Sequence, residues 1–126
     1  MVPQPVALGL MLCDYVIVEE GTSKVSLIGT FAKMEPGVYP FTPPPFVLFA
    51  TLTGGTGKGI LEVIVNRMKD VEEVFTQSAP VEFHDRFGRV RVILRIRDLT
   101  FPDSGDYEFS LLIDGEPVAS TRLRLL

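Results

Sequence analysis

The chain has 126 residues, of which 46% are apolar, and its 12 Lys and Arg against 16 Asp and Glu give a net charge of −4. This length predicts one domain over residues 1–126, with a core large enough to fold without a metal or a disulfide. The single cysteine excludes an internal disulfide and a zinc site built from several thiolates, and the acidic balance gives no overall attraction for nucleic acid or an anionic membrane. The mean hydropathy is +0.28, whereas disordered chains are polar and highly charged, so we expect a folded chain. This value is also high for a soluble monomer.

An apolar run near the start of the chain, Val6–Cys13, looks like the core of an export signal. No Lys or Arg precedes it, it is only eight residues long, and Leu12 stands where a small residue should precede the cleavage point. We therefore expect a buried first strand that carries a free, packed cysteine, and a cytoplasmic protein. No apolar stretch reaches the roughly 18–20 residues that span a bilayer, so we expect no membrane segment.

Two hairpins are predicted in the first half of the chain. The side chains of Lys24–Phe31 alternate after a turn at Glu20–Ser23, which predicts a strand that pairs with the first one. The five prolines of Pro36–Pro45 cannot lie inside a sheet and indicate an extended crossover. Phe46–Thr53 and Ile60–Met68 are rich in strand-forming residues, and the glycine-rich turn between them predicts the second hairpin.

The middle of the chain carries weaker signals. Val74–Ala79 and Val81–Phe87 are candidate strands separated by Pro80. The segment Val63–Val74 also contains residues that suit a helix, but its start is β-branched and no N-cap is evident. We therefore predict a strand, a turn at Lys69-Asp70, and another strand.

The most specific motif precedes a predicted strand over Tyr107–Ile113. Asp103, Gly105 and Tyr107 form the Asp-x-Gly-x-Tyr pattern of a tyrosine corner, in which the tyrosine hydroxyl bonds to backbone a few residues upstream. Antibody domains carry a cysteine two residues after this tyrosine, whereas this chain has Phe109 and no tryptophan. The motif and the strand count predict an all-β fold, an antiparallel immunoglobulin-like β-sandwich of about eight or nine strands with no disulfide.

The register of the last hairpin is predicted from its alternation. A three-residue loop at Asp114–Glu116 keeps Tyr107 and Leu123 together on the inner face, whereas a two-residue loop would place Leu123 beside a charged residue. The longer loop gives four further opposite pairs, which are Asp106 and Arg124, Glu108 and Arg122, Phe109 and Thr121, and Leu112 and Val118. The last of these pairs is a candidate apolar contact on the outer face.

The sequence contains one candidate catalytic group, the imidazole of His84. Nothing local supplies the serine or cysteine that a nucleophilic site would need. Metal binding with Glu82 and Asp85 is disfavoured because neighbouring residues on a strand point to opposite faces, so we predict a solvated His84. The glycine-rich turn Gly54–Gly59 lacks the spacing of a phosphate-binding loop. We predict no catalytic residue, no metal and no cofactor.

An arginine row is the most informative polar feature. It lies on one face of the predicted strand Val90–Arg97, spans about 25 Å, and consists of Arg89, Arg91, Arg95 and Arg97. In one interpretation it is an interaction face for an acidic partner or a phosphate backbone. In the other, the arginines pair with carboxylates of adjacent strands, such as Glu62 or Glu73, and keep the face soluble. We favour the second interpretation and expect no nucleic-acid partner, because the chain is acidic and no aromatic residue lies among the arginines.

Four segments together resemble a known family: Leu12–Tyr15, Lys24–Phe31, the proline-rich crossover, and Phe101–Pro117. They look like an uncharacterised bacterial family of small cytoplasmic β-sandwich proteins, a domain of unknown function. The resemblance implies a β-sandwich from a bacterium or phage, and it carries over no catalytic residue.

Two functions follow from these observations. The lack of a nucleophile with its base, of a metal cluster and of a cofactor loop favours a non-enzymatic protein-interaction or structural module, with a protein partner or a second copy of itself. The alternative is a small-ligand-binding or enzymatic domain with a pocket near the Pro36–Pro45 crossover and His84, although no particular small molecule is indicated. Apolar residues on both faces of Tyr15–Val18, Phe46–Leu52 and Ile60–Val65 favour the first, since a two-layer sandwich covers only one face of each strand.

Overall fold

The alternating segments of the sequence form strands that are arranged in two facing sheets. A computed structural model describes residues 4–126, and within this range the chain forms nine strands and no helix. The strands are β1 (Val6–Val18), β2 (Val25–Thr30), β3 (Lys33–Met34), β4 (Phe46–Thr53), β5 (Gly57–Arg67), β6 (Glu72–Phe83), β7 (Arg89–Ile96), β8 (Gly105–Ile113) and β9 (Glu116–Leu125). The prediction of an all-β fold is confirmed.

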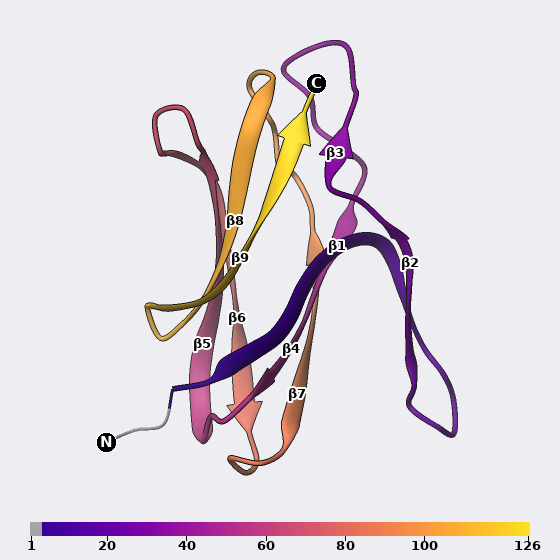
Figure 1. Ribbon diagram of the computed structural model, residues 1–126, viewed down its shortest axis with the longest axis vertical. Helices are drawn as coiled ribbons and strands as arrows, with labels where there is room; N and C mark the ends of the chain where they lie inside the picture. The colour runs from indigo at the N-terminus through magenta and orange to yellow at the C-terminus, as the bar shows by residue number, and fades with distance from the viewer. Residues whose placement is uncertain (1–3) are drawn as a thin grey trace.

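The strand order identifies the type of sandwich. One sheet has the order β2-β1-β4-β7 and the other the order β3-β9-β8-β5-β6 (Figure 1). Strands β1, β4 and β7 correspond to A, B and E of an immunoglobulin-like sandwich, and β9, β8, β5 and β6 correspond to G, F, C and C′. The short β3 adds a parallel pairing to β9. The predicted immunoglobulin-like sandwich is therefore confirmed, and Cys13 is free and buried.

The hydrophobic core fills the space between the two sheets. On β4 every second side chain points inward and is buried, namely Phe46, Leu48, Ala50 and Leu52. The inner face of β8 contributes the same pattern from the opposite sheet, with Tyr107, Phe109, Leu111 and Ile113. This period of two is the alternation from which the strands were predicted. Removal of these side chains from water is the main stabilising contribution to the fold.

The tyrosine corner forms as predicted. The hydroxyl of Tyr107 donates a hydrogen bond to the backbone carbonyl of Asp103 over 2.8 Å. The Tyr107 ring is fully buried and meets Phe101 edge to face, with ring centroids 4.9 Å apart. Gly105 has a φ of +131°, a backbone conformation that side-chain-bearing residues rarely adopt. Asp103, Gly105 and Tyr107 thus have a structural role, because together they fix the conformation of the corner.

The centre of the chain confirms one prediction and corrects another. A turn separates β5, which ends at Arg67, from β6, which begins at Glu72, as the strand-turn-strand prediction requires. However, the two weak strands predicted on either side of Pro80 are a single strand, β6. Pro80 is tolerated because β6 is the edge of its sheet and pairs, among the described strands, with β5 alone, so no second strand of that set needs the missing N–H.

The last hairpin has the predicted register near its base and a different turn at its tip. Ile113 pairs with Glu116, so the loop has two residues, and their positive φ angles suit a tight hairpin turn. A bulge then inserts Val118 as an extra residue, and Leu111 pairs with Ala119. The predicted contact between Leu112 and Val118 is wrong, because Leu112 lies opposite Pro117 while Val118 packs against the core.

Gly55 offers a test of how tightly the end of the sandwich is packed. A Cβ added at this buried glycine would lie 2.9 Å from ring atoms of Phe83, which is itself buried. We expect Gly55→Ala to lower the free energy of unfolding by about 1–3 kcal/mol through overpacking, measured by urea denaturation. Gly9→Ala is the matched control, because nothing lies within 4 Å of its added Cβ. Equal midpoints for the Gly55 variant and the wild type would contradict the prediction.

Candidate interaction surface

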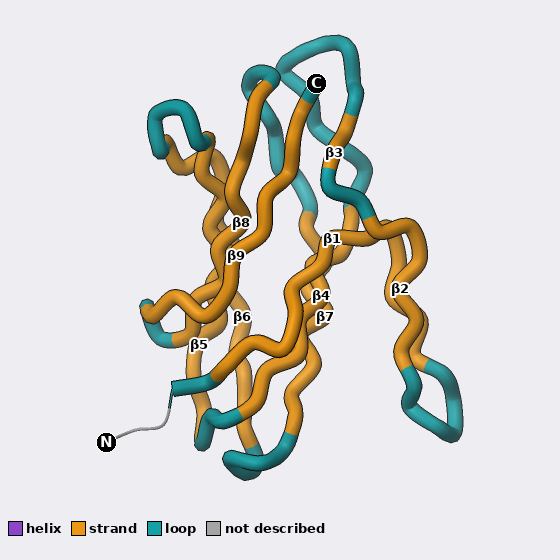
Figure 2. The backbone as a smooth tube through the Cα atoms, in the orientation of Figure 1, coloured by secondary structure: helices purple, strands orange, loops and turns teal. Residues whose placement is uncertain are grey.

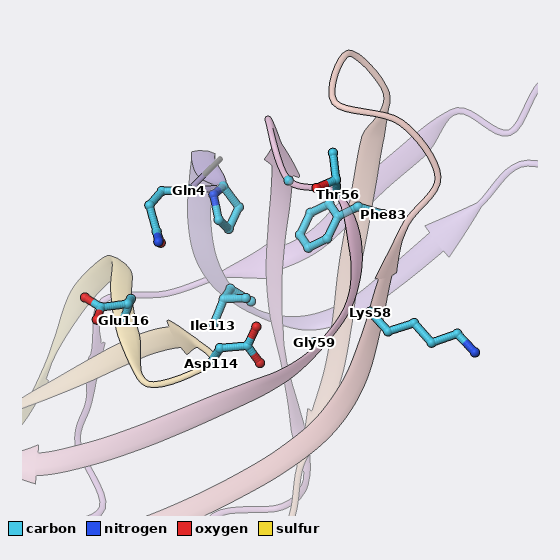
Figure 3. Close-up of a pocket in the computed structure, with 10 residues that line it drawn as sticks. Gln4, Thr56, Lys58, Gly59, Phe83, Ile113, Asp114 and Glu116 are labelled. Atoms are coloured by element: carbon cyan, nitrogen blue, oxygen red, sulfur yellow. The ribbon is translucent and has the colours of Figure 1, made fainter. Parts of the chain in front are cut away.

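The cavity nearest the glycine-rich turn does not combine the residues of a catalytic site. It has a volume of about 340 Å³ and is lined by residues that include Gln4, Lys58, Phe83, Asp114 and Glu116 (Figure 3). The Asp114 carboxylate accepts a hydrogen bond from the backbone N–H of Ile60 over 2.8 Å, and the Lys58 side chain points away from it. Neither His84 nor the proline-rich crossover, the two elements near which the ligand-binding alternative placed its pocket, lines this cavity.

The other candidate chemical groups are also separated. His84 is exposed just after β6, as predicted, and Asp85 accepts hydrogen bonds from the backbone N–H groups of Phe87 and Gly88. Over residues 4–126, no three His, Cys, Asp or Glu side chains gather where they could hold a metal ion. Burial raises the pKa of the Cys13 thiol, and Asp14 raises it further, so the thiol form is favoured. The described part of the chain also contains no helix long and apolar enough to cross a membrane.

The most unusual feature of the surface is a two-stranded arm, residues 15–28, formed by the end of β1 and most of β2. Strand β2 pairs only with β1 among the described strands, and the arm stands apart from the sheet that contains β5, β8 and β9 (Figures 1 and 2). At the base of the arm Gly29 has a φ of +70°, and an added Cβ would collide with the Asp14 carboxylate. A glycine is therefore required where the chain returns to the sandwich.

The arm exposes large apolar side chains. Tyr15 is 66% exposed, Ile17 is 52% exposed and Ile28 is 44% exposed. Tyr15 lies directly opposite Ile28 in the ribbon, and Ile17 follows on the same face, so the three form one apolar outer face. Val16 and Val25 on the other face are half-buried. The arm thus has the two apolar faces predicted for Tyr15–Val18.

Two hollows, together called the groove here, lie between the arm and the outer face of β4 and β7. One hollow of about 270 Å³ lies between Tyr15, Val16, Val47, Ile93 and Arg95. A second hollow, of about 540 Å³, is bounded by Ser23 and Val25 of the arm and by the β4 and β7 side chains Phe49, Thr51, Arg89 and Arg91. The groove is therefore lined by apolar side chains and by arginines of β7.

The arginine row borders this groove and is not neutralised by the residues predicted to pair with it. Among residues 4–126, no carboxylate lies within 4.0 Å of a nitrogen of the four arginines. The predicted pairing with Glu62 or Glu73 is wrong, because those residues belong to β5 and β6 in the other sheet. The neighbour of the row is β4, which places Thr51 and Thr53 opposite Arg91 and Arg89. Arg91 donates instead to the backbone carbonyl of Ser23.

Three carboxylates form an ion cluster around Arg67 that was not predicted from the sequence. Arg67 lies 2.9 Å from Asp70 and 3.3 Å from Asp103, and it also contacts Glu72. The hydrogen bond from Lys69 holds the pKa of Asp103 below its ordinary value, and Arg67 lowers it further. The cluster joins the β5–β6 turn to the tyrosine corner, so its role is structural. The charge-rich stretch from Arg67 to Glu73 was its only signal in the sequence.

Comparisons with known proteins agree with the fold and establish no activity for this chain. A protein-family model described as a family of unknown function (DUF6941) matches residues 8–126. Among solved structures, the alkylpurine DNA glycosylase AlkC of Pseudomonas fluorescens, bound to DNA containing an abasic site analog, matches 97% of this chain with a TM-score of 0.55 and 14% identity. The chain spans 30% of the length of that glycosylase, and the likeness is one of fold alone. An immunoglobulin-like protein from Pseudomonas aeruginosa matches with a TM-score of 0.45 and 10% identity, over 98% of this chain and 97% of its own length.

The search of curated proteins finds no match. The match to a family of unknown function confirms the resemblance drawn from the sequence segments.

Proposed function

We propose that this chain, which belongs to the family of unknown function DUF6941, is a non-enzymatic cytoplasmic interaction module that binds a second copy of itself. The single observation that carries the proposal is the exposed apolar outer face of the arm, formed by Tyr15, Ile17 and Ile28. An apolar face of this kind marks a contact surface when neighbouring strands leave it uncovered.

The construction of the arm supports this proposal. A two-stranded ribbon is only marginally stable in water, because it has too little apolar contact to offset the loss of chain entropy. Between Tyr15 and Ile28 the arm pairs with no third strand among the described residues. Full burial of a large apolar side chain contributes roughly 1.5–3 kcal/mol. Cover from a second copy would therefore stabilise a segment that one sandwich leaves exposed.

A nucleic-acid function has less support. The glycosylase that shares the fold is bound to DNA, but the likeness to this chain is limited to the fold. The net charge of −4 opposes binding to a polyanion, and the position between Arg91 and Arg95 holds Ile93 where a base-stacking site would carry an aromatic ring.

The test of the proposed function measures the mass of the protein in solution. We expect sedimentation equilibrium from micromolar to millimolar concentration to show masses above the 13.9 kDa of one chain. Tyr15→Thr together with Ile28→Thr keeps strand-forming residues but removes most of the apolar face, and should weaken self-association by about tenfold or more.

Ile60→Thr is the matched control, because Ile60 is 55% exposed on β5, outside the arm. It should leave the mass distribution unchanged. A wild-type mass that stays at 13.9 kDa over the whole range would overturn the proposal. So would equal losses of association in the arm variant and the Ile60 control.

A further inference from the structure

We propose that the groove beside the arginine row receives the tip of the arm of a second copy, with Glu19 and Glu20 of one copy facing Arg91 and Arg95 of the other. This inference rests on the proposed self-association and names the two surfaces that meet. The groove would then hold a tight turn that carries two carboxylates and directly follows exposed apolar residues.

The groove has the chemistry that such a segment requires. Guanidinium groups of Arg91 and Arg95 stand at its border, and no carboxylate within residues 4–126 pairs with them. Phe49 and Ile93 supply apolar surface between and beside the charges. A guanidinium group binds a carboxylate through a planar pair of donors, so the row favours carboxylates as ligands.

The tip of the arm is the segment of this chain that matches the groove. Glu19 and Glu20 follow directly after Ile17 and Val18, and all four are exposed. The turn is closed by backbone hydrogen bonds between Glu19 and the residues Ser23 and Lys24, which leave both carboxylates available. No salt bridge within residues 4–126 involves either glutamate.

Several of the other acidic residues are already engaged. Asp70 and Glu72 contact Arg67, and Asp106 lies 2.9 Å from Arg124. Asp85 and Asp114 accept hydrogen bonds from backbone N–H groups at their turns. Of the two adjacent acidic pairs in the sequence, Glu72-Glu73 has one member bound to Arg67, whereas neither Glu19 nor Glu20 takes part in a salt bridge within residues 4–126.

The positions of the two surfaces allow a closed pair. In each chain the tip lies next to its own groove, since Arg91 donates to the carbonyl of Ser23 at the turn. Two copies that face each other across these surfaces can thus each supply one tip and one groove. A contact of this reciprocal kind closes at two copies, so the expected assembly is a dimer with two-fold symmetry.

Charge reversal tests the two surfaces separately. Glu19→Lys with Glu20→Lys reverses the tip, and Arg91→Glu with Arg95→Glu reverses the groove. Each double variant alone should lose at least tenfold in dimer affinity, because like charges then meet twice in every dimer. The affinity of the wild type should also fall as sodium chloride is raised, since these contacts lie at the surface. Arg86→Glu with Arg122→Glu makes a similar change of charge at exposed sites away from the groove, and should have no effect.

The decisive measurement mixes the two reversed variants. In a mixed dimer each tip meets a groove of opposite charge, so an equimolar mixture should recover a dimer of nearly wild-type affinity in sedimentation velocity. Urea midpoints equal to that of the wild type, measured at a concentration where the wild type is monomeric, show that both variants are folded. A mixture that stays monomeric would overturn the inference, and so would dimers of undiminished affinity in either reversed variant.

The outcomes also separate this inference from the proposed function. If Tyr15→Thr with Ile28→Thr dissociates the dimer while both charge reversals leave it intact, the apolar contact stands and the tip-to-groove contact falls. A wild type that is monomeric at every concentration would overturn both the proposed self-association and the tip-to-groove contact. If Arg91→Glu with Arg95→Glu abolishes binding to a single-stranded oligonucleotide and leaves the dimer unchanged, the groove serves nucleic acid and the inference is overturned.

Discussion

Replacement of Tyr107 by alanine is expected to lower the free energy of unfolding by about 3–5 kcal/mol, and Tyr107→Phe by about 1–3 kcal/mol. Alanine removes a fully buried ring that packs edge to face on Phe101 and leaves a cavity in the core. Phenylalanine keeps the ring and removes only the hydroxyl that donates to the carbonyl of Asp103. Urea denaturation of the two variants therefore separates the packing of the ring from the hydrogen bond of the corner.

Tyr15→Phe is the matched control for the hydroxyl. Tyr15 is 66% exposed, and no hydrogen bond of its hydroxyl occurs within the described residues. Its loss should leave the free energy of unfolding within about 0.5 kcal/mol of the wild type, as at other surface positions. A Tyr107→Phe protein as stable as the wild type would show that the corner hydrogen bond contributes nothing to folding.

Ionisation of Tyr107 is also expected to make the free energy of unfolding depend on pH in the alkaline range. Burial raises the pKa of Tyr107 to about 12, from an ordinary value near 10. The folded state therefore holds the neutral phenol at a pH where the unfolded chain releases its proton. The buried neutral phenol of Tyr107 therefore contributes its full share of the stability below pH 10, and this contribution is lost as the pH rises from 10 to about 12. Over this window the stability difference between the wild type and Tyr107→Phe should narrow.

The corner could be predicted because all its determinants are local. Asp103, Gly105 and Tyr107 lie within five residues, and the hydrogen bond joins the first to the last. Strand positions followed in the same way from the period of two in the side chains. The residues that face one another across a sheet could not be predicted in this way, because they depend on which strands become neighbours. The pairing of the arginine row with Glu62 or Glu73 failed for this reason, since β7 lies beside β4.

The last hairpin shows a second limit of sequence reasoning. The prediction tied the register of Tyr107 and Leu123 to the length of the loop, because a slip by one residue turns every side chain to the other face. The structure keeps that register with a shorter loop, since the bulge at Val118 supplies the missing residue. Alternation predicted correctly which residues of β8 are buried, but it could not distinguish a longer loop from a bulge, and it placed Val118 on the wrong face.

The arm was predictable as a hairpin but not as a projection. Alternation indicated that Lys24–Phe31 pairs with the first strand, and the apolar residues on both faces were visible in the sequence. At its base Gly29 has a φ of +70° and lies close to Asp14, which is 15 positions away in the chain. The hollows of the groove lie between the arm and β4 and β7, so no local pattern predicted them, whereas the arginine row beside them followed from the alternation of one strand.

The base of the arm is joined to the core through Phe46, and this link leads to the second large effect. The Phe46 ring meets Phe31, which follows the arm, with centroids 5.5 Å apart, and it meets Phe109 of the opposite sheet at 6.1 Å. We expect Phe46→Ala to lower the free energy of unfolding by about 3–5 kcal/mol, because it removes a buried aromatic ring. Urea denaturation measures the loss, and Phe46→Leu, which refills most of the volume, should recover part of it.

The effect of Phe46→Ala should extend to the arm. Phe31 donates its backbone N–H to the carbonyl of Leu12 over 3.0 Å, and its ring is held by Phe46. In a double-mutant cycle, Phe46→Ala and Phe31→Ala should couple by about 0.5–1.5 kcal/mol, the usual range for an aromatic pair. Hydrogen exchange at the Phe31 amide should be faster in Phe46→Ala by more than the change in global stability accounts for. If the two substitutions are additive, and exchange at Phe31 follows global unfolding alone, the aromatic contact does not position the arm. In that case the orientation of the arm depends on Gly29 and the β1–β2 pairing.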